Sequence, residues 1–352
     1  MNENRSTPPR KKKRRPTLLD VARMAGVGTT TVSRVINGGH YVDPATMSKV
    51  QDVMERLGYQ PSQAARALKG EKTHSIGMIV PTLRDPFFAN LASVVQQITR
   101  QKNYLLIVLA SEDDPLQEMA ELDRFRSYRV DGMLVVPPRV QTQRFLSAVK
   151  SLAIPTVALD RPLEMRCSSV LCDNFEAAKA AVQHLLAHGR RRVLCLGGDP
   201  DLYTIKERVR GYEDAVADAG LKPRVLTGAD ARQLIGALKE RFANLRERPD
   251  AIFAVHGDAS VSAYEFLLDS SYKIPQEVAL IGFDEFPLAG TLRPTLSVIR
   301  QPIHELGTTA ARMLFEQIDG EAGNPRRITI ATELIPRMSC GCEHRTDAPR
   351  HL

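Results

Sequence analysis

The sequence lacks the features that direct a protein into a membrane or out of the cell. It contains no apolar run of about 18 residues, the length that a membrane-spanning helix requires, and no basic segment followed by an apolar one as in a signal peptide. Its 352 residues are 43% apolar, which is enough to build two or three folded domains. We therefore expect a soluble, intracellular, globular protein.

Cysteines are few and scattered through the chain. Their odd number, five, does not suggest a disulfide framework and fits a reducing cytoplasm. The five are Cys167, Cys172, Cys195, Cys340 and Cys342. The pair Cys340-Gly-Cys342 is closer than the usual spacing of a metal knuckle, with only His344 beside it in sequence. We expect no metal site and no cofactor.

Motifs of common enzyme classes are also missing. No predicted strand is followed by G-x-G-x-x-G, and G-x-x-x-x-G-K-[ST], H-E-x-x-H and G-x-S-x-G do not occur. Covalent catalysis requires a nucleophile with a neighbouring base, which the sequence does not indicate. We therefore expect a protein that is not an enzyme. The enzyme alternative is a sugar-processing enzyme with a basic tail.

Positive charge is concentrated at the beginning of the chain. Residues 1–72 contain 14 Lys and Arg against 6 Asp and Glu, whereas the whole chain has a net charge of +7, so the rest is close to neutral. A small basic module on a near-neutral body is typical of a protein that binds nucleic acid or an anionic membrane. Within it, the segment RKKKRRP (Arg10–Pro16) is either a phosphate-binding arm or a solvated tail.

Residues 29–37 favour nucleic acid over membrane. At about 100° per residue, a helix here has Val32, Val35 and Ile36 on one side. The other side carries short hydrogen-bonding groups and one guanidinium, on Thr29, Thr30, Ser33, Arg34 and Asn37. A membrane-surface helix would instead set large apolar residues against a Lys- and Arg-rich face. The observed face suits contact with base edges.

Two further helical patterns flank this segment. An apolar stripe over residues 18–25 precedes it, and Gly26-Val27-Gly28 supplies the tight turn between the two helices. A third helix is predicted after Asp43-Pro44, a capping residue followed by proline at the first helical position. The three patterns predict a helix-turn-helix DNA-binding head; the alternative is a helical hairpin used only for packing.

From residue 75 onward, short apolar runs alternate with helical patterns, which predicts parallel sheets covered by helices. The predicted strands are 76–80, 105–109, 133–136, 156–159, 193–196, 252–255 and 279–282.

A weak internal repeat pairs RVDGMLVVP and IPTVALD with RPDAIFAVH and IPQEVALIGFD, and each copy ends a strand on an aspartate, Asp160 or Asp284. Carboxylates at the carboxyl ends of strands in two similar lobes would face a shared crevice. The alternative is that the two aspartates only cap turns.

Three stretches, TLLDVARMAGVGTTTVSRVIN, LGYQPSQAARALKG and SIGMIVP, resemble the LacI/GalR family of bacterial transcriptional regulators. The resemblance extends in order from Thr17 to about Ser339. It implies that the helix from Thr29 lies in the major groove, with Thr29, Thr30 and Arg34 reading bases. Gly28 departs from the usual Ser or Thr, which removes one phosphate contact.

The resemblance also implies that residues 62–68 form a hinge helix, which is short enough to fold only against the same helix of a second subunit on DNA. Ala65 and Arg66 would belong to the hinge. Leu68, followed by Lys69, would insert into the minor groove. The alternative role for Leu68 is packing on the effector domain.

The effector domain implied by the resemblance is similar to periplasmic sugar-binding proteins, with a small molecule between two lobes. The residues expected to contact that molecule are Asp85, Phe87, Phe88, Asp160, Thr204, Arg208, Asp284 and Gln301. His256-Gly257-Asp258 stands where the family usually has Asn-Asp, and Glu285 replaces an aspartate. These departures affect which ligand binds, not whether a cleft exists.

The expected fold class is therefore an all-α helix-turn-helix head followed by an α/β body of two parallel-sheet lobes. We expect the basic arm at 1–16, the head at 17–61, the hinge and linker at 62–73, the ligand-binding and dimerisation domain at 74–340 and a tail at 341–352. The first lobe is predicted at 74–160 and 292–320, and the second at 162–290 and 322–340.

The expected function is a homodimeric repressor that binds a pseudo-palindromic operator and responds to a sugar, sugar acid or nucleoside-like effector. The alternative is a DNA-binding regulator that answers to a protein co-effector or to no ligand.

Overall fold

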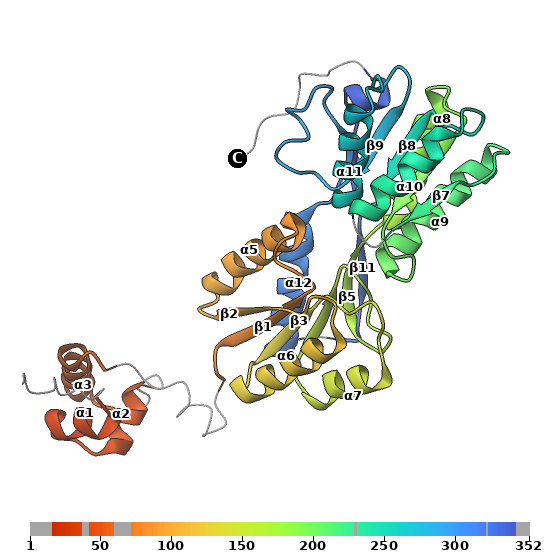
Figure 1. Ribbon diagram of the computed structural model, residues 1–352. Coiled ribbons are helices and arrows are strands. Elements are labelled where there is room, and N and C mark those ends of the chain that lie inside the picture. The colour runs from red at the N-terminus through yellow and green to blue at the C-terminus, as the bar shows by residue number, and fades with distance from the viewer. Residues whose placement is uncertain (1–15, 37–41, 60–71, 229–230, 322, 343–352) are drawn as a thin grey trace, which may run out of the picture. The chain divides into compact units, whose positions relative to one another are not determined.

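The computed structural model describes residues 16–36, 42–59, 72–228, 231–321 and 323–342, and the chain divides into two compact units, residues 1–73 and 74–352 (Figure 1). Several predictions fall outside the described residues: those for the basic arm, Asn37, Ala65, Arg66, Leu68 and Lys69. In the described ranges, no helix combines the length and apolar character needed to cross a membrane.

The described part of the first unit, the head, consists of α1 (Leu18–Ala25), α2 (Thr29–Ile36) and α3 (Pro44–Leu57) around a core of valine and alanine. Local signals define the ends of these helices. A capping box joins Thr17 and Asp20 at the start of α1, where the Thr17 backbone N–H donates to Asp20 Oδ2 at 2.8 Å. Gly26 ends α1 with a φ of +66°, a conformation that glycine adopts without strain. At the start of α3, the Asp43 carboxylate accepts from the Thr46 N–H at 3.0 Å.

The second unit, the body, contains two sheets. The first lobe has a parallel sheet in the order β11-β5-β4-β3-β1-β2. Its strands are β1 (Ser75–Val80), β2 (Leu105–Ala110), β3 (Gly132–Val135), β4 (Thr156–Leu159), β5 (Ser168–Cys172) and β11 (Arg327–Ile330). Helices α5 (Pro86–Gln101) and α12 (Ile303–Ile318) cover one face, and α6 (Pro115–Tyr128) and α7 (Gln143–Ser151) cover the other (Figure 1).

The second lobe repeats this three-layer plan with the strand order β12-β10-β9-β8-β6-β7. Its strands are β6 (Val193–Gly197), β7 (Val225–Thr227), β8 (Ala251–Ala254), β9 (Ala279–Phe283), β10 (Ser297–Arg300) and β12 (Glu333–Ile335), of which β12 runs antiparallel to β10. Helices α8 (Asn174–Ala187) and α9 (Tyr203–Asp218) cover one face, and α10 (Ala231–Ala243) and α11 (Gly257–Asp269) cover the other. A short 3₁₀ helix, η1 (Met338–Cys340), packs beside β9 and β10.

The predicted lobe boundaries differ from the observed sheets at three places. β5 belongs to the first lobe because it pairs with β4, although residues 162–290 were assigned to the second. β10 belongs to the second lobe through its pairing with β9, and β11 returns to the first through its pairing with β5. The chain therefore crosses between the lobes after β5, β10 and β11, because pairing with a distant strand, not position in sequence, decides where each short strand lies.

Candidate functional site

The exposed face of α2 carries the residues predicted to read bases. Thr29, Thr30 and Arg34 are exposed and Ser33 is half-buried, whereas Val32 and Val35 are buried in the head core. The left-handed Gly26 turns the chain between α1 and α2, so that the following valine packs on the same core. The described residues of α2 therefore present a face of short polar groups with one guanidinium, and their role in reading bases stays a prediction.

A cleft in the body forms the second candidate site. The parallel strands of each sheet end on the same side, and the loops that follow β1, β4, β6, β8, β9 and β10 line a cavity of about 330 Å³. All of the predicted effector-contacting residues line it: Asp85, Phe87, Phe88, Asp160, Thr204, Arg208, Asp284 and Gln301. A neighbouring hollow of about 430 Å³ shares Asp85, Phe87, Asp284 and Gln301 with it. The structure thus brings together residues from both lobes.

The two strand-end aspartates occupy equivalent positions in the two sheets. Asp160 and Asp284 both have left-handed backbones, with φ values of +62° and +71°. The Asp160 N–H donates to Val170 O on β5 at 3.0 Å, and the Asp284 N–H donates to Ile299 O on β10 at 2.9 Å. The same sharp turn after β4 and after β9 therefore directs both carboxylates into the cavity. Burial raises the pKa of Asp160, while the nearby Arg161 and Arg208 guanidiniums lower it.

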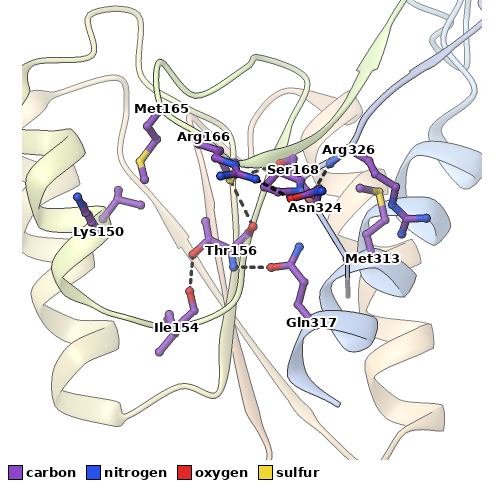
Figure 2. Close-up of a pocket in the computed structure, with 14 residues that line it drawn as sticks. Lys150, Ile154, Thr156, Met165, Arg166, Ser168, Met313, Gln317, Asn324 and Arg326 are labelled. Atoms are coloured by element: carbon purple, nitrogen blue, oxygen red, sulfur yellow. Dashed lines mark hydrogen bonds between the residues drawn. The ribbon is translucent and has the colours of Figure 1, made fainter. Parts of the chain in front are cut away.

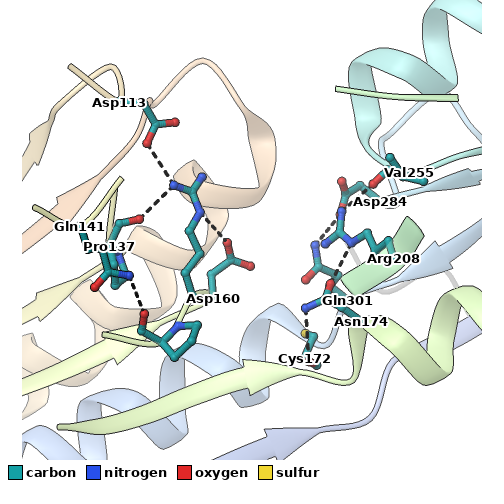
Figure 3. Close-up of polar contacts among 12 residues, drawn as sticks. Asp113, Pro137, Gln141, Asp160, Cys172, Asn174, Arg208, Val255, Asp284 and Gln301 are labelled. Atoms are coloured by element: carbon teal, nitrogen blue, oxygen red, sulfur yellow. Dashed lines mark hydrogen bonds and ion pairs between the residues drawn. The ribbon is translucent and has the colours of Figure 1, made fainter. Parts of the chain in front are cut away.

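Gln301 and Asp284 form a polar pair in the cleft (Figure 3). The Gln301 amide donates from Nε2 to Asp284 Oδ1 at 2.5 Å. Its carbonyl oxygen, Oε1, is buried and has no hydrogen-bond partner among the described residues. An unpaired buried acceptor costs free energy unless another molecule supplies a donor.

Arg208 on α9 is held in place by a set of contacts on the same side of the cleft (Figure 3). Its Nε donates to Asn174 Oδ1 at 2.8 Å, its Nη1 donates to Val255 O at 2.7 Å, and its guanidinium lies 3.5 Å above the centre of the Phe283 ring. Burial lowers the pKa of Arg208, and Asp284 and Asp160 raise it. These contacts orient the guanidinium before any ligand arrives.

Arg161 is a site residue that the sequence prediction missed. Its Nη1 donates to Asp113 Oδ1 at 3.0 Å and to Pro137 O at 2.9 Å. Its Nε lies 3.7 Å from Asp160 Oδ2, too far for a hydrogen bond, and has no hydrogen-bond partner among the described residues. Its place directly after the strand-end Asp160 was the signal that could have identified it.

Acidic groups outnumber basic ones in the cavity lining. Asp85 caps α5, where its Oδ1 accepts from the Phe87 N–H at 2.9 Å. Burial, with smaller contributions from Asp284, Asp258 and Asp160, raises the pKa of Asp85 to about 6. The lining carboxylates are those of Asp85, Asp113, Asp160, Asp199, Asp258 and Asp284, and the lining guanidiniums are those of Arg161 and Arg208.

His256, which the sequence analysis noted only as a departure from the family, also lines the cavity. Its Nδ1 accepts from the Ala259 N–H at 3.3 Å and caps α11. Burial lowers the pKa of His256, which favours the neutral imidazole that this bond requires.

A separate cavity of about 300 Å³ lies in the first lobe where β4 and β5 begin (Figure 2). Its polar groups largely pair with one another: the Thr156 N–H donates to Gln317 Oε1 at 3.2 Å, and Arg166 donates to Asn324 Oδ1 at 2.6 Å. It holds none of the predicted residues. The cleft at the carboxyl ends of the strands is the stronger candidate for ligand binding.

Comparison with known proteins matches both units to one family. Residues 17–62 match the model for bacterial regulatory proteins of the lacI family, and residues 73–338 match the model for periplasmic binding proteins and the sugar-binding domain of the LacI family. The HTH-type transcriptional repressor PurR of Aliivibrio fischeri (strain MJ11) is 32% identical over 329 residues, which cover 92% of this chain and 98% of PurR.

Two further comparisons agree. The ribose operon repressor of Escherichia coli (strain K12) is 31% identical over 338 residues, covering 92% of this chain and 99% of the repressor. The solved structure of the transcriptional regulator CelR–cellobiose complex matches with a TM-score of 0.70 at 28% identity, covering 92% of this chain and 100% of CelR. The predicted fold class is confirmed, and the chain belongs to the LacI family of bacterial regulatory proteins.

Proposed function

We propose that this protein is an operator-binding transcriptional repressor whose affinity for DNA is set by a small, uncharged, polyhydroxylated effector in the cleft. The polar face of α2 and the repressor relatives support the DNA-binding part. A two-fold dimer would place one α2 on each half of a pseudo-palindromic operator. Because such an operator lies on bacterial DNA, the protein would act in the cytoplasm.

One observation carries the ligand chemistry: two buried polar atoms of the cavity have no hydrogen-bond partner among the described residues. Gln301 is 6% exposed and offers the acceptor Oε1, and Arg161 is 4% exposed and offers the donor Nε. Gln301 follows β10 of the second lobe, whereas Arg161 follows β4 of the first. A hydroxyl group both donates and accepts hydrogen bonds. A molecule with several hydroxyls could satisfy both atoms and join the two lobes.

The charge of the lining separates neutral from anionic ligands. Asp113 already accepts a hydrogen bond from the Arg161 guanidinium, and the carboxylates in the lining outnumber the guanidiniums. The carboxylate of a sugar acid would meet like charges in a partly desolvated cavity, which disfavours its binding. We therefore infer a neutral sugar or nucleoside, in line with the sugars in the names of the ribose operon repressor and the CelR–cellobiose complex.

The alternative effector, a partner protein, fits this cleft less well. A cavity of about 330 Å³ has the size of a small-molecule site, and the two lining atoms without a hydrogen bond to any described residue belong to buried side chains. We also infer binding without catalysis, because the described polar groups of the lining form aspartate–glutamine and arginine–aspartate pairs that orient a ligand.

A thermal-shift screen of the full chain tests the ligand class. Neutral sugars and nucleosides should raise the melting temperature of the body, and matched sugar acids should not. Fluorescence anisotropy with an operator selected from a random library then measures the effect of each hit on DNA affinity. Ligand and operator affinities must change each other by the same factor.

Two cleft variants and one control test the site. Arg208→Ala and Asp284→Asn should leave operator affinity unchanged without ligand and abolish the response to it. Arg210→Ala is the matched control, because Arg210 lies on the same helix with an exposed side chain that pairs with Glu207. A normal response in both cleft variants would refute the assigned site, and tighter binding of sugar acids than of their neutral parents would refute the ligand class.

A further inference from the structure

Two cysteines and a histidine from distant parts of the second lobe form one cluster, and a second histidine contacts one of the cysteines. His184 Nε2 lies 3.3 Å from Cys340 Sγ and 3.4 Å from Cys342 Sγ. The ligand atoms of these three residues all lie within 4.8 Å of one another. His188 Nε2 lies 3.4 Å from Cys342 Sγ, and the two imidazole rings are 4.6 Å apart between centroids.

The backbone fixes this arrangement from two sides. On one side, His184 lies in the last turn of α8 and His188 follows as its C-cap, four residues later and so on the same helix face. On the other side, η1 carries Cys340, whose backbone N–H donates to Ser297 Oγ at 3.2 Å. Gly341 then turns the chain with a φ of +103°, which returns Cys342 to the side of Cys340.

The neighbouring Ser339 anchors η1 to the sheet. Its hydroxyl donates to Leu280 O at 2.6 Å and accepts from the Ser297 N–H at 2.8 Å. The four ligand-type side chains therefore project from segments whose positions the fold already determines, so that little ordering is required when a ligand binds.

The donor set matches a thiophilic metal ion. Two thiolates and two imidazoles in a tetrahedron are a common structural coordination of Zn²⁺, with Zn–S bonds of about 2.3 Å and Zn–N bonds of about 2.0–2.1 Å. These bond lengths place sulfur and nitrogen about 3.5 Å apart along an edge of the tetrahedron. The distances from His184 Nε2 to Cys340 Sγ and Cys342 Sγ, 3.3 and 3.4 Å, and from His188 Nε2 to Cys342 Sγ, 3.4 Å, are close to that value. His188 lies outside the group of three whose ligand atoms are all within 4.8 Å of one another, so its ring would shift to complete the tetrahedron. Hard cations such as Mg²⁺ and Ca²⁺ prefer oxygen ligands and do not fit.

We propose that these four side chains form a structural Zn²⁺ site that fastens the segment after η1 to the end of α8. Binding of Zn²⁺ would release to solvent the protons that remain on the ligands, leaving two thiolates, two neutral imidazoles and no net charge at the site. Residues 184 and 340 are 156 positions apart in the chain, so the metal would close a long loop and stabilise the second lobe.

The pKa shifts at the proposed ligands do not all point one way. Burial raises the pKa of the Cys340 thiol, but hydrogen bonds from His184, Ser297 and Cys342 outweigh burial and bring it to about 6. Burial, with the neighbouring His184 and Arg190, lowers the pKa of His188. These two shifts favour the thiolate of Cys340 and the neutral imidazole of His188. Burial and the neighbouring Cys340, by contrast, raise the pKa of Cys342 to about 11, so a metal ion must displace the Cys342 proton; the proposal rests on the geometry of the side chains.

Metal titration of the full chain tests the proposal. The protein is reduced, stripped of metal with a chelator and titrated with Zn²⁺ against a chromogenic zinc chelator. We expect one Zn²⁺ per chain and a higher melting temperature of the body. Substitution of Co²⁺ should give the visible absorption of a tetrahedral ion together with a sulfur-to-cobalt charge-transfer band. Bound Zn²⁺ should also protect Cys342, the less buried thiol, from alkylation.

Variants distinguish the proposed ligands from other zinc-binding groups. Cys342→Ser and His188→Asn should each weaken Zn²⁺ binding by at least about 100-fold, since loss of an outer-shell partner alone costs up to that factor. Both residues are incompletely buried, so these variants should fold. Cys167→Ser and His304→Asn, in the first lobe, are the matched controls and should bind Zn²⁺ as the parent does.

Three results would overturn the site. The first is a fully reduced protein that binds no Zn²⁺, which would leave only thiol–imidazole hydrogen bonds. The second is Zn²⁺ binding that survives both ligand variants. The third is a requirement for His344, which lies outside the described residues, in place of His188. None of these results bears on the effector cleft, because each is read from metal binding alone.

Discussion

Asp85→Asn should stabilise the body and weaken the effector site at the same time. The Asp85 carboxylate caps α5 through the Phe87 N–H at 2.9 Å, and an asparagine side-chain oxygen can accept the same bond. The substitution therefore keeps the cap and removes a charge that burial and the other cleft carboxylates disfavour. The buried carboxylate lowers the stability of the free protein, and the protein tolerates this loss because the carboxylate is needed to bind hydroxyl groups of the effector.

The size of the gain follows from the pKa of Asp85, which rises from 3.8 to about 6 on folding. Between these values the folded chain holds a proton that the unfolded chain has released, so stability falls as the pH rises. Each unit of difference between the folded and unfolded pKa values corresponds to about 1.4 kcal/mol in the free energy of unfolding. Asp85 therefore lowers the free energy of unfolding by about 1 kcal/mol near pH 4.5 and about 3 kcal/mol near pH 7.5. Both values are upper limits because the side chain is partly exposed.

Scanning calorimetry of the full chain at both pH values measures this difference. Each kcal/mol should raise the melting temperature of the body by about 2–4 °C, so the variant's gain should be larger at the higher pH. Asp114→Asn is a matched control, because Asp114 caps α6 through the Leu116 N–H at 2.8 Å in the same Asp-Pro context but is exposed. Equal effects of the two substitutions at both pH values would refute the reasoning.

The remaining predictions concern DNA binding and packing. Arg34→Ala should cost about 1–3 kcal/mol in operator binding and relax the preference at one base pair per half-site, whereas the exposed Arg23→Ala should do neither; uniform weakening across a degenerate operator library would instead indicate a phosphate contact. Removal of Arg10–Arg15 should lower the salt dependence of operator affinity without altering sequence preference, and an unaltered salt slope would mean a solvated tail. Leu68→Ala should abolish tight operator binding and reduce the bend angle in circular-permutation gel shifts at an unchanged melting temperature, and a parental bend angle would exclude the wedge role. Gly211→Ala should destabilise the body by about 1–3 kcal/mol in calorimetry, because its Cβ would lie 2.2 Å from a backbone oxygen of α8; a parental melting temperature would show that α8 and α9 can separate freely.

The sequence by itself determined the helices of the head and the edge of the sheets at which the cleft lies, because both depend on local signals. Thr17-x-x-Asp20, Gly26 and Asp43-Pro44 set helix ends through contacts within a few residues. The repeat that places Asp160 and Asp284 at strand ends is also local, and parallel strands must present their carboxyl ends on one side. The effector-contacting residues themselves came from the resemblance to the family.

Only the tertiary structure decided which segments cross between the lobes and which distant side chains meet. β5, β10 and β11 are short strands of four or five residues whose lobes depend on their partners, and no local pattern encodes a partner. The contact of Arg161 with Asp113 spans 48 positions, and that of His184 with Cys340 spans 156. Helix packing and strand order bring such groups together, so the cluster of His184, Cys340 and Cys342 cannot be deduced from the spacing of the two cysteines alone.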